Sequence, residues 1–315
     1  MDKHVLTVTV NPALDITMTV PGLRSGRISC DVVQAVTAGG KGINVARALR
    51  LLGVPVFAAG IAAGETGDRL KNLLAQERIP YGLFTTEGLT RINWTIVDPR
   101  DKSHIRVLGP GPRLAPKEIR RFESAYGRWL RDSSMVVLAG RNARQAPDEL
   151  YARLTCMAKK RNIPVVVDTS GPPLSSALSS GPFMIKPNLE EAADVYGRRI
   201  RSMAQIKKAV KWFHHFGVEI VVLSMGEHGA VGSNRKEIWH IIPPRVPVKN
   251  DVGCGDALLA GFIHAWRRAD SFRDALRWAV AAGTANAMSP TPGAIRRSDV
   301  MRLFRRLSLK FIKCC

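Results

Sequence analysis

The chain has 315 residues, of which 45% are hydrophobic and 6% aromatic, a composition typical of a globular protein that buries a sizeable core. Its 47 Lys and Arg against 26 Asp and Glu give a formal charge of +21, which would attract nucleic acid, anionic membrane or phosphorylated metabolites without choosing among them. No apolar run reaches the roughly 18 residues of a membrane span, and the start lacks the apolar segment of a secretory signal, so we expect a cytoplasmic protein. The five cysteines are scattered and form no C-x-x-C pair, so we expect neither a zinc site nor a disulfide framework.

Apolar, β-branched runs alternate with helical-period segments along most of the chain. This alternation predicts an α/β fold with a mainly parallel central sheet, flanked by helices on both faces, in a single domain over residues 1–315. The predicted strands are 4–10, 135–140, 163–170, 183–188 and 218–226. The predicted helices are 42–53, 67–79, 146–162, 188–197, 203–217, 255–269, 271–289 and 297–312.

Two segments, about residues 14–36 and 81–107, interrupt this alternation with short strands and turns and no helix. We predict that they pair into a small separate sheet beside the main one. Because a mobile cover excludes water from reactive phosphates, we interpret this sheet as a lid over a ligand cleft.

The segment "AGGKGINVARALRLLG", residues 38–53, places glycines directly before a predicted helix. Gly39, Gly40 and Gly42 allow the backbone to approach a ligand closely. Lys41 adds a cation, and Asn44 offers both a donor and an acceptor to hydroxyl groups. The pattern G-x-x-x-x-G-K-[ST] of a P-loop is absent, and a sharp turn before a helix explains the same letters equally well.

The segment "KPNLEEA", residues 186–192, ends a predicted strand and begins an acidic helix. Asn188 and Glu191 lie three residues apart, over the same end of that helix, where they could hold a hydrated Mg²⁺. The same pair matches a capping box, with Asn188 as the N-cap and Glu191 at N3. The two interpretations are compatible.

The segment "LSMGEHGAVGS", residues 223–233, follows a predicted strand with glycines at 226, 229 and 232. Open α/β sheets bind nucleotides at such strand ends. A plain hairpin connection is the alternative.

The segment "NDVGCGDALLAGF", residues 250–262, combines two glycines, a cysteine and an acid before a predicted helix. The amides of Gly253, Cys254 and Gly255 could converge on an anion at the helix N-terminus, where the helix dipole favours negative charge. Asp256 would lie in the first turn, within reach of the same anion. A carboxylate there suggests that a proton must be taken or a metal shared, and an ordinary helix-start acid is the alternative.

The C-terminal segment, residues 297–312, suggests a function of another class, the binding of nucleic acid or of a membrane surface. As a helix, it would present apolar residues near one face: Val300, Phe304, Leu307 and Phe311. Its charge would come from Arg302, Arg305, Arg306 and Lys313. A helix packed on the domain, with a solvated outer face, is the alternative.

Seven segments, in this order, resemble the ribokinase-like (PfkB) family of carbohydrate kinases over nearly the whole chain. They are "TVNPALD", "AGGKGINVARALRLLG", "TRIN", "VDTSG", "KPNLEEA", "LSMGEHGAV" and "VGCGDALLAG". Each segment is a weak signal, but their common order is specific. The resemblance implies a ribokinase-like fold with a β-sheet lid, ATP as phosphoryl donor, Mg²⁺ as its metal, and a homodimer completed through the lid.

The resemblance also implies roles for particular residues. Asp256 would accept the proton of the sugar hydroxyl that attacks the γ-phosphate, and the amides of Gly253, Cys254 and Gly255 would form an anion hole. The residues expected to hold sugar hydroxyls are Asp15, Gly39, Gly40 and Asn44. Those expected at the phosphate already on the substrate are Lys41, Arg91 and Arg106. The expected ATP contacts are Lys186, Asn188, Ser224, Gly226, Gly229 and Asn286, and the metal is expected at Asn188 and Glu191.

Three residues depart from the family pattern. Arg141, in "AGRNARQAP", replaces a small, serine-rich segment beside the sugar, so it either binds the substrate phosphate or marks a change of specificity. Asp251 replaces a small or hydroxyl residue before the anion hole and adds charge near the metal. Cys254 replaces an alanine of nearly the same size, so the hole should persist.

The segments "NPALD", "KGINVA" and "TRIN" resemble the phosphosugar branch of the family, and in particular the 1-phosphofructokinases. The implied activity is ATP-dependent phosphorylation of a ketohexose phosphate, with fructose 1-phosphate converted to fructose 1,6-bisphosphate. Tagatose 6-phosphate and fructose 6-phosphate are alternative acceptors. A basic protein that binds nucleic acid or membrane on a kinase-like scaffold is the alternative from another class.

Overall fold

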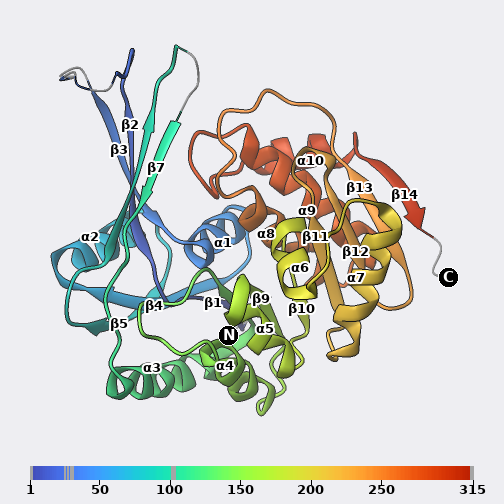
Figure 1. Ribbon diagram of the computed structural model, residues 1–315, viewed down its shortest axis with the longest axis horizontal. Coiled ribbons are helices and arrows are strands. Elements are labelled where there is room, and N and C mark those ends of the chain that lie inside the picture. The colour runs from blue at the N-terminus through green and yellow to red at the C-terminus, as the bar shows by residue number, and fades with distance from the viewer. Residues whose placement is uncertain (1–2, 25, 27, 29–31, 101–103, 313–315) are drawn as a thin grey trace.

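The computed structural model describes residues 3–24, 26, 28, 32–100 and 104–312, arranged around two β-sheets (Figure 1). The larger sheet has ten strands within these ranges, in the order β14 (Ser308–Ile312), β13 (Ile238–Ile242), β12 (Ala230–Ser233), β11 (Ile220–Ser224), β10 (Met184–Ile185), β9 (Val165–Asp168), β8 (Ser133–Ala139), β1 (His4–Thr9), β4 (Val56–Ala63) and β5 (Tyr81–Thr86). Neighbours from β11 to β5 are parallel, and β12, β13 and β14 add antiparallel.

Helices cover both faces of the large sheet, as the sequence predicts. One face carries α1 (Lys41–Leu51), α2 (Gly64–Gln76), α8 (Cys254–Trp266), α9 (Phe272–Ala287) and α10 (Arg297–Phe304). The other carries α3 (Pro116–Trp129), α4 (Leu150–Lys159), α5 (Gly171–Ser179), α6 (Leu189–Tyr196) and α7 (Met203–His215). Successive strand residues enter opposite cores: Val137 lies in the first, and Val136 and Leu138 lie in the second. The mainly parallel, doubly covered α/β sheet is therefore confirmed.

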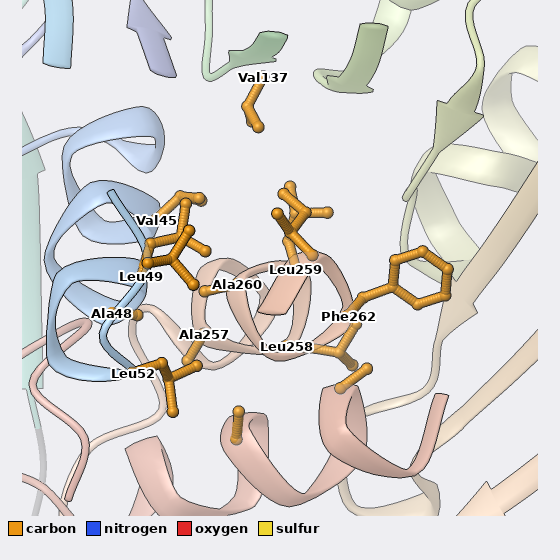
Figure 2. Packing of buried hydrophobic residues seen from close by; sticks show 14 of the residues in the cluster. Val45, Ala48, Leu49, Leu52, Val137, Ala257, Leu258, Leu259, Ala260 and Phe262 are labelled. Carbon is orange, nitrogen blue, oxygen red and sulfur yellow. The ribbon is translucent and has the colours of Figure 1, made fainter. Parts of the chain in front are cut away.

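Helix α8 lies at the centre of the first core and is apolar on nearly all sides (Figure 2). Its Ala260 lies against Val45 and Leu49 of α1, and its Leu259 points toward Val137 of the sheet. A Cβ on Gly261 would lie 2.4 Å from the carbonyl oxygen of Trp278, so the glycine allows α9 to approach the helix closely. Packing on three sides fixes the position of the N-terminus of α8.

The smaller sheet projects from the body of the molecule (Figure 1) and has the order β3 (Val33–Gly39), β2 (Ala13–Thr19), β6 (Arg91–Val97) and β7 (His104–Leu108). The predicted small separate sheet is therefore confirmed. One boundary is wrong: within the predicted lid segment 81–107, strand β5 pairs with β4 in the large sheet. Its Phe84 ring packs 6.3 Å from Phe122 of α3, which anchors β5 in the second core. Residues 25, 27, 29–31 and 101–103 of the predicted lid lie outside the described residues.

The C-terminal segment does not form the single amphipathic helix predicted over residues 297–312. Helix α10 ends at Phe304, and β14 pairs antiparallel with β13. Strand pairing places the Phe311 ring 5.0 Å from that of Trp239, a cross-strand contact that a continuing helix could not make. The apolar helical face behind the hypothesis of a membrane-surface or nucleic-acid binding protein is thus absent, and Lys313 lies outside the described residues. Within the described ranges, no helix is long and apolar enough to span a membrane.

Candidate active site

The predicted site residues converge where the parallel strands of the large sheet end and α1 and α8 begin. Asp168 ends β9, Lys186 follows β10, and Lys41 opens α1. The carboxyl ends of parallel strands meet at one edge of a sheet, which is where α/β proteins bind ligands. The small sheet begins beside this edge, because β3 leads directly into α1.

Asp256 lies in the first turn of α8 and is only 5% exposed. Its Oδ2 accepts a hydrogen bond from Asn44 Nδ2 at 2.8 Å. Burial, followed by the charge of Asp168, raises the pKa of Asp256 to about 6, although Lys41, Asn44 and Lys186 act in the opposite direction. The carboxylate is therefore ionised at neutral pH and more basic than an exposed aspartate. Asn44, expected at sugar hydroxyls, here holds this carboxylate.

The start of α8 has the geometry expected of the predicted anion hole. Gly253 is the N-cap, with φ 80°, in the left-handed region that favours glycine, and no described side chain caps the helix. A Cβ on Gly255 would lie 3.2 Å from Lys186 Nζ, so this ammonium lies over the first helical turn. Amides, helix dipole and ammonium all favour an anion here.

Asp168 joins two lysines at the centre of the site. Its carboxylate is buried and lies 3.0 Å from Lys41 Nζ and 3.1 Å from Lys186 Nζ. Burial alone would raise the pKa of Asp168, but Lys186 and Lys41 outweigh burial and hold it below its usual range. Asp168 was not predicted to have a role, although it lies within the predicted strand 163–170 and in the segment "VDTSG".

Two of the cations expected at the substrate phosphate, Lys41 and Arg106, form ion pairs with carboxylates. Lys41 Nζ contacts Asp168 and lies 3.5 Å from Glu191 Oε1, on the side of the predicted magnesium residues. Burial opposes the charge of Lys41, but Asp168, Glu191 and Asp256 together raise its pKa. Arg106 of β7 donates to Asp251 Oδ1 at 2.5 Å and so ties the small sheet to the loop before α8. These carboxylates lie far from both cations in the sequence, so the sequence did not reveal the ion pairs.

Asn188 and Glu191 form the predicted capping box of α6. The Glu191 amide donates to Asn188 Oδ1 at 2.8 Å, and the Asn188 amide donates to Glu191 Oε2 at 2.9 Å. Glu191 Oε1 takes no part in the capping box and lies 3.5 Å from Lys41 Nζ. No group of three potential ligand residues surrounds a metal position among the described residues. This arrangement fits a hydrated Mg²⁺ carried by phosphate oxygens, since Mg²⁺ keeps most of its waters, and does not fit an all-protein metal cage.

The residues expected at sugar hydroxyls lie at the base of the small sheet. Asp15 Oδ1 accepts from Asn93 Nδ2 at 2.7 Å, and burial raises the pKa of Asp15. A Cβ on Gly39 would lie 2.1 Å from Asp15 Oδ2, so only glycine leaves room for this carboxylate. Gly40 is the N-cap of α1, with φ 112°. Asn93 was missed, although it stands in the quoted segment "TRIN".

Arg91 lies near both Asp15 and Arg141. Burial lowers the pKa of Arg91, the charge of Asp15 raises it, and the charge of Arg141 lowers it again. Among the described residues, neither Arg91 nor Arg141 has a carboxylate oxygen within 4 Å. Two adjacent unpaired guanidinium groups favour a bound anion.

Among the expected nucleotide residues, Lys186 and Asn188 lie between β10 and α6, and Ser224, Gly226 and Gly229 lie on β11 and its connection to β12. Ser224 ends β11 and forms an isolated bridge with Asn188, and Gly226 and Gly229 bound a hairpin turn into β12. The hairpin alternative is therefore correct, and it leaves these residues at the ligand edge of the sheet. The expectation for Asn286 is not supported, because its side chain is fully buried. Its Nδ2 donates to the carbonyl of Val252 at 2.8 Å, so it fixes the anion-hole loop.

The chain is similar to known proteins over most of its length. The model of the pfkB family carbohydrate kinases matches residues 15–295. A 1-phosphofructokinase from Rhodobacter capsulatus is 33% identical over 84% of both chains. A 1-phosphofructokinase from Bacillus subtilis is 30% identical over 92% of this chain and 94% of its own length. The structure of phosphofructokinase-2 from Escherichia coli with potassium superposes with a TM-score of 0.91, at 28% identity, covering 96% of this chain and 99% of that one.

Replacing Asp168 with asparagine is expected to lower the free energy of unfolding by about 3–5 kcal/mol, because the buried ammonium of Lys186 and the partly exposed ammonium of Lys41 lose their shared counter-ion. The matched control is Asp68→Asn, which breaks the exposed pair with Lys71 and should cost at most about 0.5 kcal/mol. Urea unfolding measures both.

The difference between wild type and Asp168→Asn should also depend on pH. Because the pKa of folded Asp168 is depressed, its contribution is complete above the unfolded pKa of about 4 and is lost as pH falls through the folded pKa. A cost as small as that of the control, at neutral pH, would contradict the assigned pairing.

Proposed function

We propose, since the chain belongs to the pfkB family of carbohydrate kinases, that it transfers the γ-phosphoryl group of ATP to fructose 1-phosphate and forms fructose 1,6-bisphosphate. The chain is a sugar-phosphate kinase homologous to 1-phosphofructokinase, and the choice of acceptor is the proposal. The observation that supports phosphoryl transfer is the buried, ionised Asp256 at the start of α8, a helix that no described side chain caps, with Lys41 and Lys186 nearby.

Asp256 is the proposed general base. It takes the proton of the acceptor hydroxyl as the new oxygen–phosphorus bond forms and the bond to the leaving ADP oxygen breaks. A base with a pKa of about 6 is deprotonated at neutral pH and still basic enough to accept that proton. Phosphoryl transfer passes through a loose transition state, so positioning of this carboxylate matters more than its strength.

The charge that develops on the transferred group is proposed to be stabilised by the start of α8 and by Lys186. The amides of Gly253, Cys254 and Gly255 donate to it, and the ammonium over the first turn adds a full positive charge. Lys41 and Glu191 would orient the hydrated Mg²⁺ and the nucleotide from the other side. The metal, when bound, neutralises phosphate charge.

The acceptor's own phosphate is proposed to bind Arg91 and Arg141. Among the described residues, neither guanidinium has a carboxylate partner within 4 Å, and Arg91 lies near Asp15, which with Asn93 would receive the sugar hydroxyls. The proposed contact with the acceptor's phosphate explains why an arginine is present at position 141. Fructose 6-phosphate and tagatose 6-phosphate carry the same charge, and they are the alternative acceptors.

The small sheet is proposed to act as the lid and to complete a homodimer. Its edge strand β7 carries Ile105 and Val107 on one face, and each side chain is more than half exposed. A second copy of the sheet would cover these two apolar side chains.

Asp256→Asn is expected to lower kcat by on the order of 10²–10⁴, because the proton acceptor is lost while the shape is kept. Unfolding free energy should be unchanged or higher, because burial disfavours the wild-type charge. In the wild type, kcat should decrease below about pH 6, as Asp256 becomes protonated. A coupled ADP assay measures the kcat of the variant and the pH dependence of the wild-type kcat. Activity within about threefold of wild type would contradict the general-base role.

The acceptor is tested by kcat/KM for fructose 1-phosphate, fructose 6-phosphate, tagatose 6-phosphate and unphosphorylated fructose. We expect fructose 1-phosphate to be preferred and fructose to be poorest. Arg141→Met should raise the KM for the phosphorylated sugar by about tenfold or more, since a charge-assisted contact is lost, and should leave the KM for ATP unchanged. Arg144→Met is the control. Equal effects of both substitutions would show that Arg141 does not bind the acceptor.

The dimer is tested by light scattering of the wild type and of Ile105→Asp/Val107→Asp. We expect a mass of about twice that of the chain for the wild type and a monomer for the variant, because charge on both apolar positions opposes burial. A monomeric wild type at micromolar concentration would remove this proposal without affecting the kinase assignment.

A further inference from the structure

Arg47 of α1 is a buried arginine whose whole guanidinium is used. Its side chain is 5% exposed. Its Nε donates to Glu77 Oε2 at 2.5 Å, and Nη2 donates to Glu77 Oε1 at 2.7 Å and to the Ala38 carbonyl at 2.6 Å. Its Nη1 donates to Asn44 Oδ1 at 2.9 Å and to the Pro292 carbonyl at 2.8 Å. These are all the donors that an arginine has, so the group has one orientation here.

The bond to Asn44 determines which way that amide faces. Because Asn44 Oδ1 accepts from Arg47, its Nδ2 points at Asp256 and donates to it. The reversed amide would place its oxygen against the carboxylate and its NH₂ against the guanidinium, and both contacts would be repulsive. Arg47 therefore controls the only neutral hydrogen-bond donor of Asp256 among the described side chains.

Arg47 also connects the base to the anion hole. The Pro292 carbonyl that it holds is followed by Gly293, whose amide donates to Asn286 Oδ1 at 2.7 Å. Asn286 in turn donates to the Val252 carbonyl at 2.8 Å, one residue before Gly253. The segment 292–293 thus lies between the two halves of the site and contacts both.

We propose that Arg47 is a positioning residue for phosphoryl transfer: it fixes the Asn44 amide so that the Asp256 carboxylate is kept ionised and aimed at the acceptor hydroxyl. The inference rests on the proposed function. The charged groups that face Asp256 are Asp168, Lys41 and Lys186, on three other elements, and none of them contacts Arg47. Glu77 balances the charge of Arg47, so its effect on Asp256 comes through the amide.

The main test is the double variant Arg47→Met/Glu77→Gln, which removes the ion pair without leaving a buried charge unpaired. We expect kcat to decrease about tenfold or more, since a donor that stabilises the charged form is worth about one pKa unit and the base also loses its fixed aim. The pH below which kcat decreases should be about one unit higher than in the wild type, while the KM for ATP should stay within about threefold of the wild-type value.

Two further variants separate orientation from charge and from general damage. Arg47→Lys keeps the charge but has no planar fork, so it should shift the pH profile in the same direction. Arg50→Met, on the same helix, removes a cation that contacts neither Asn44 nor Asp256, and its profile should match that of the wild type.

The titration of Asp256 in the ligand-free protein, followed by carboxyl carbon NMR and assigned with Asp256→Asn, provides a readout that needs no turnover. Its pKa should rise in both Arg47 variants. A folded double variant with an unchanged Asp256 titration and unchanged kcat would overturn the proposal. If the wild type phosphorylated none of the sugars, the proposed function would fail, while the titration would still report on the Arg47 contact.

Discussion

The site depends on keeping one carboxylate charged in a place that water barely reaches. Burial of Asp256 favours its neutral form, and the neighbouring Asp168 adds to that penalty. The same Asp168, however, holds Lys41 and Lys186 at 3.0 and 3.1 Å, and both ammonium groups favour the ionised base. Asp168 thus holds the two lysines whose charges offset its own repulsion of Asp256. As a result, Asp256 has a pKa suited to proton transfer near neutral pH.

This balance requires groups from remote parts of the chain to meet within a few ångströms. The fold meets that requirement because β9 and β10 end side by side and because α8 packs against α1, α9 and the sheet. The packing of Leu259, Ala260 and Gly261 therefore acts on function as well as stability, since it sets where the first turn of α8 points. A small displacement of that turn would move the base and the anion hole together.

The alternation of apolar strands and helical segments was sufficient to predict the two-faced sheet, and glycines before helices marked both starts that form the site. The sequence did not reveal Arg47 as a site residue, because it looks like an ordinary position on a helix, and the predicted role of Asn286 as an ATP contact was wrong, because its buried side chain holds the loop before α8. The Pro292 carbonyl that Arg47 holds is 245 residues away, and no local pattern encodes such a contact. Strand β14 was mistaken for helix for a related reason: its pairing with β13 outweighs local helical periodicity.

The ion pair between Arg106 and Asp251 bridges the small sheet and the loop before α8, and its side chains are 35% and 66% exposed. Such a pair is screened by dissolved salt, whose Debye length is about 8 Å at physiological ionic strength. Ionic strength is therefore a variable that acts on the link between the small sheet and the loop before α8, the loop that leads into Asp256.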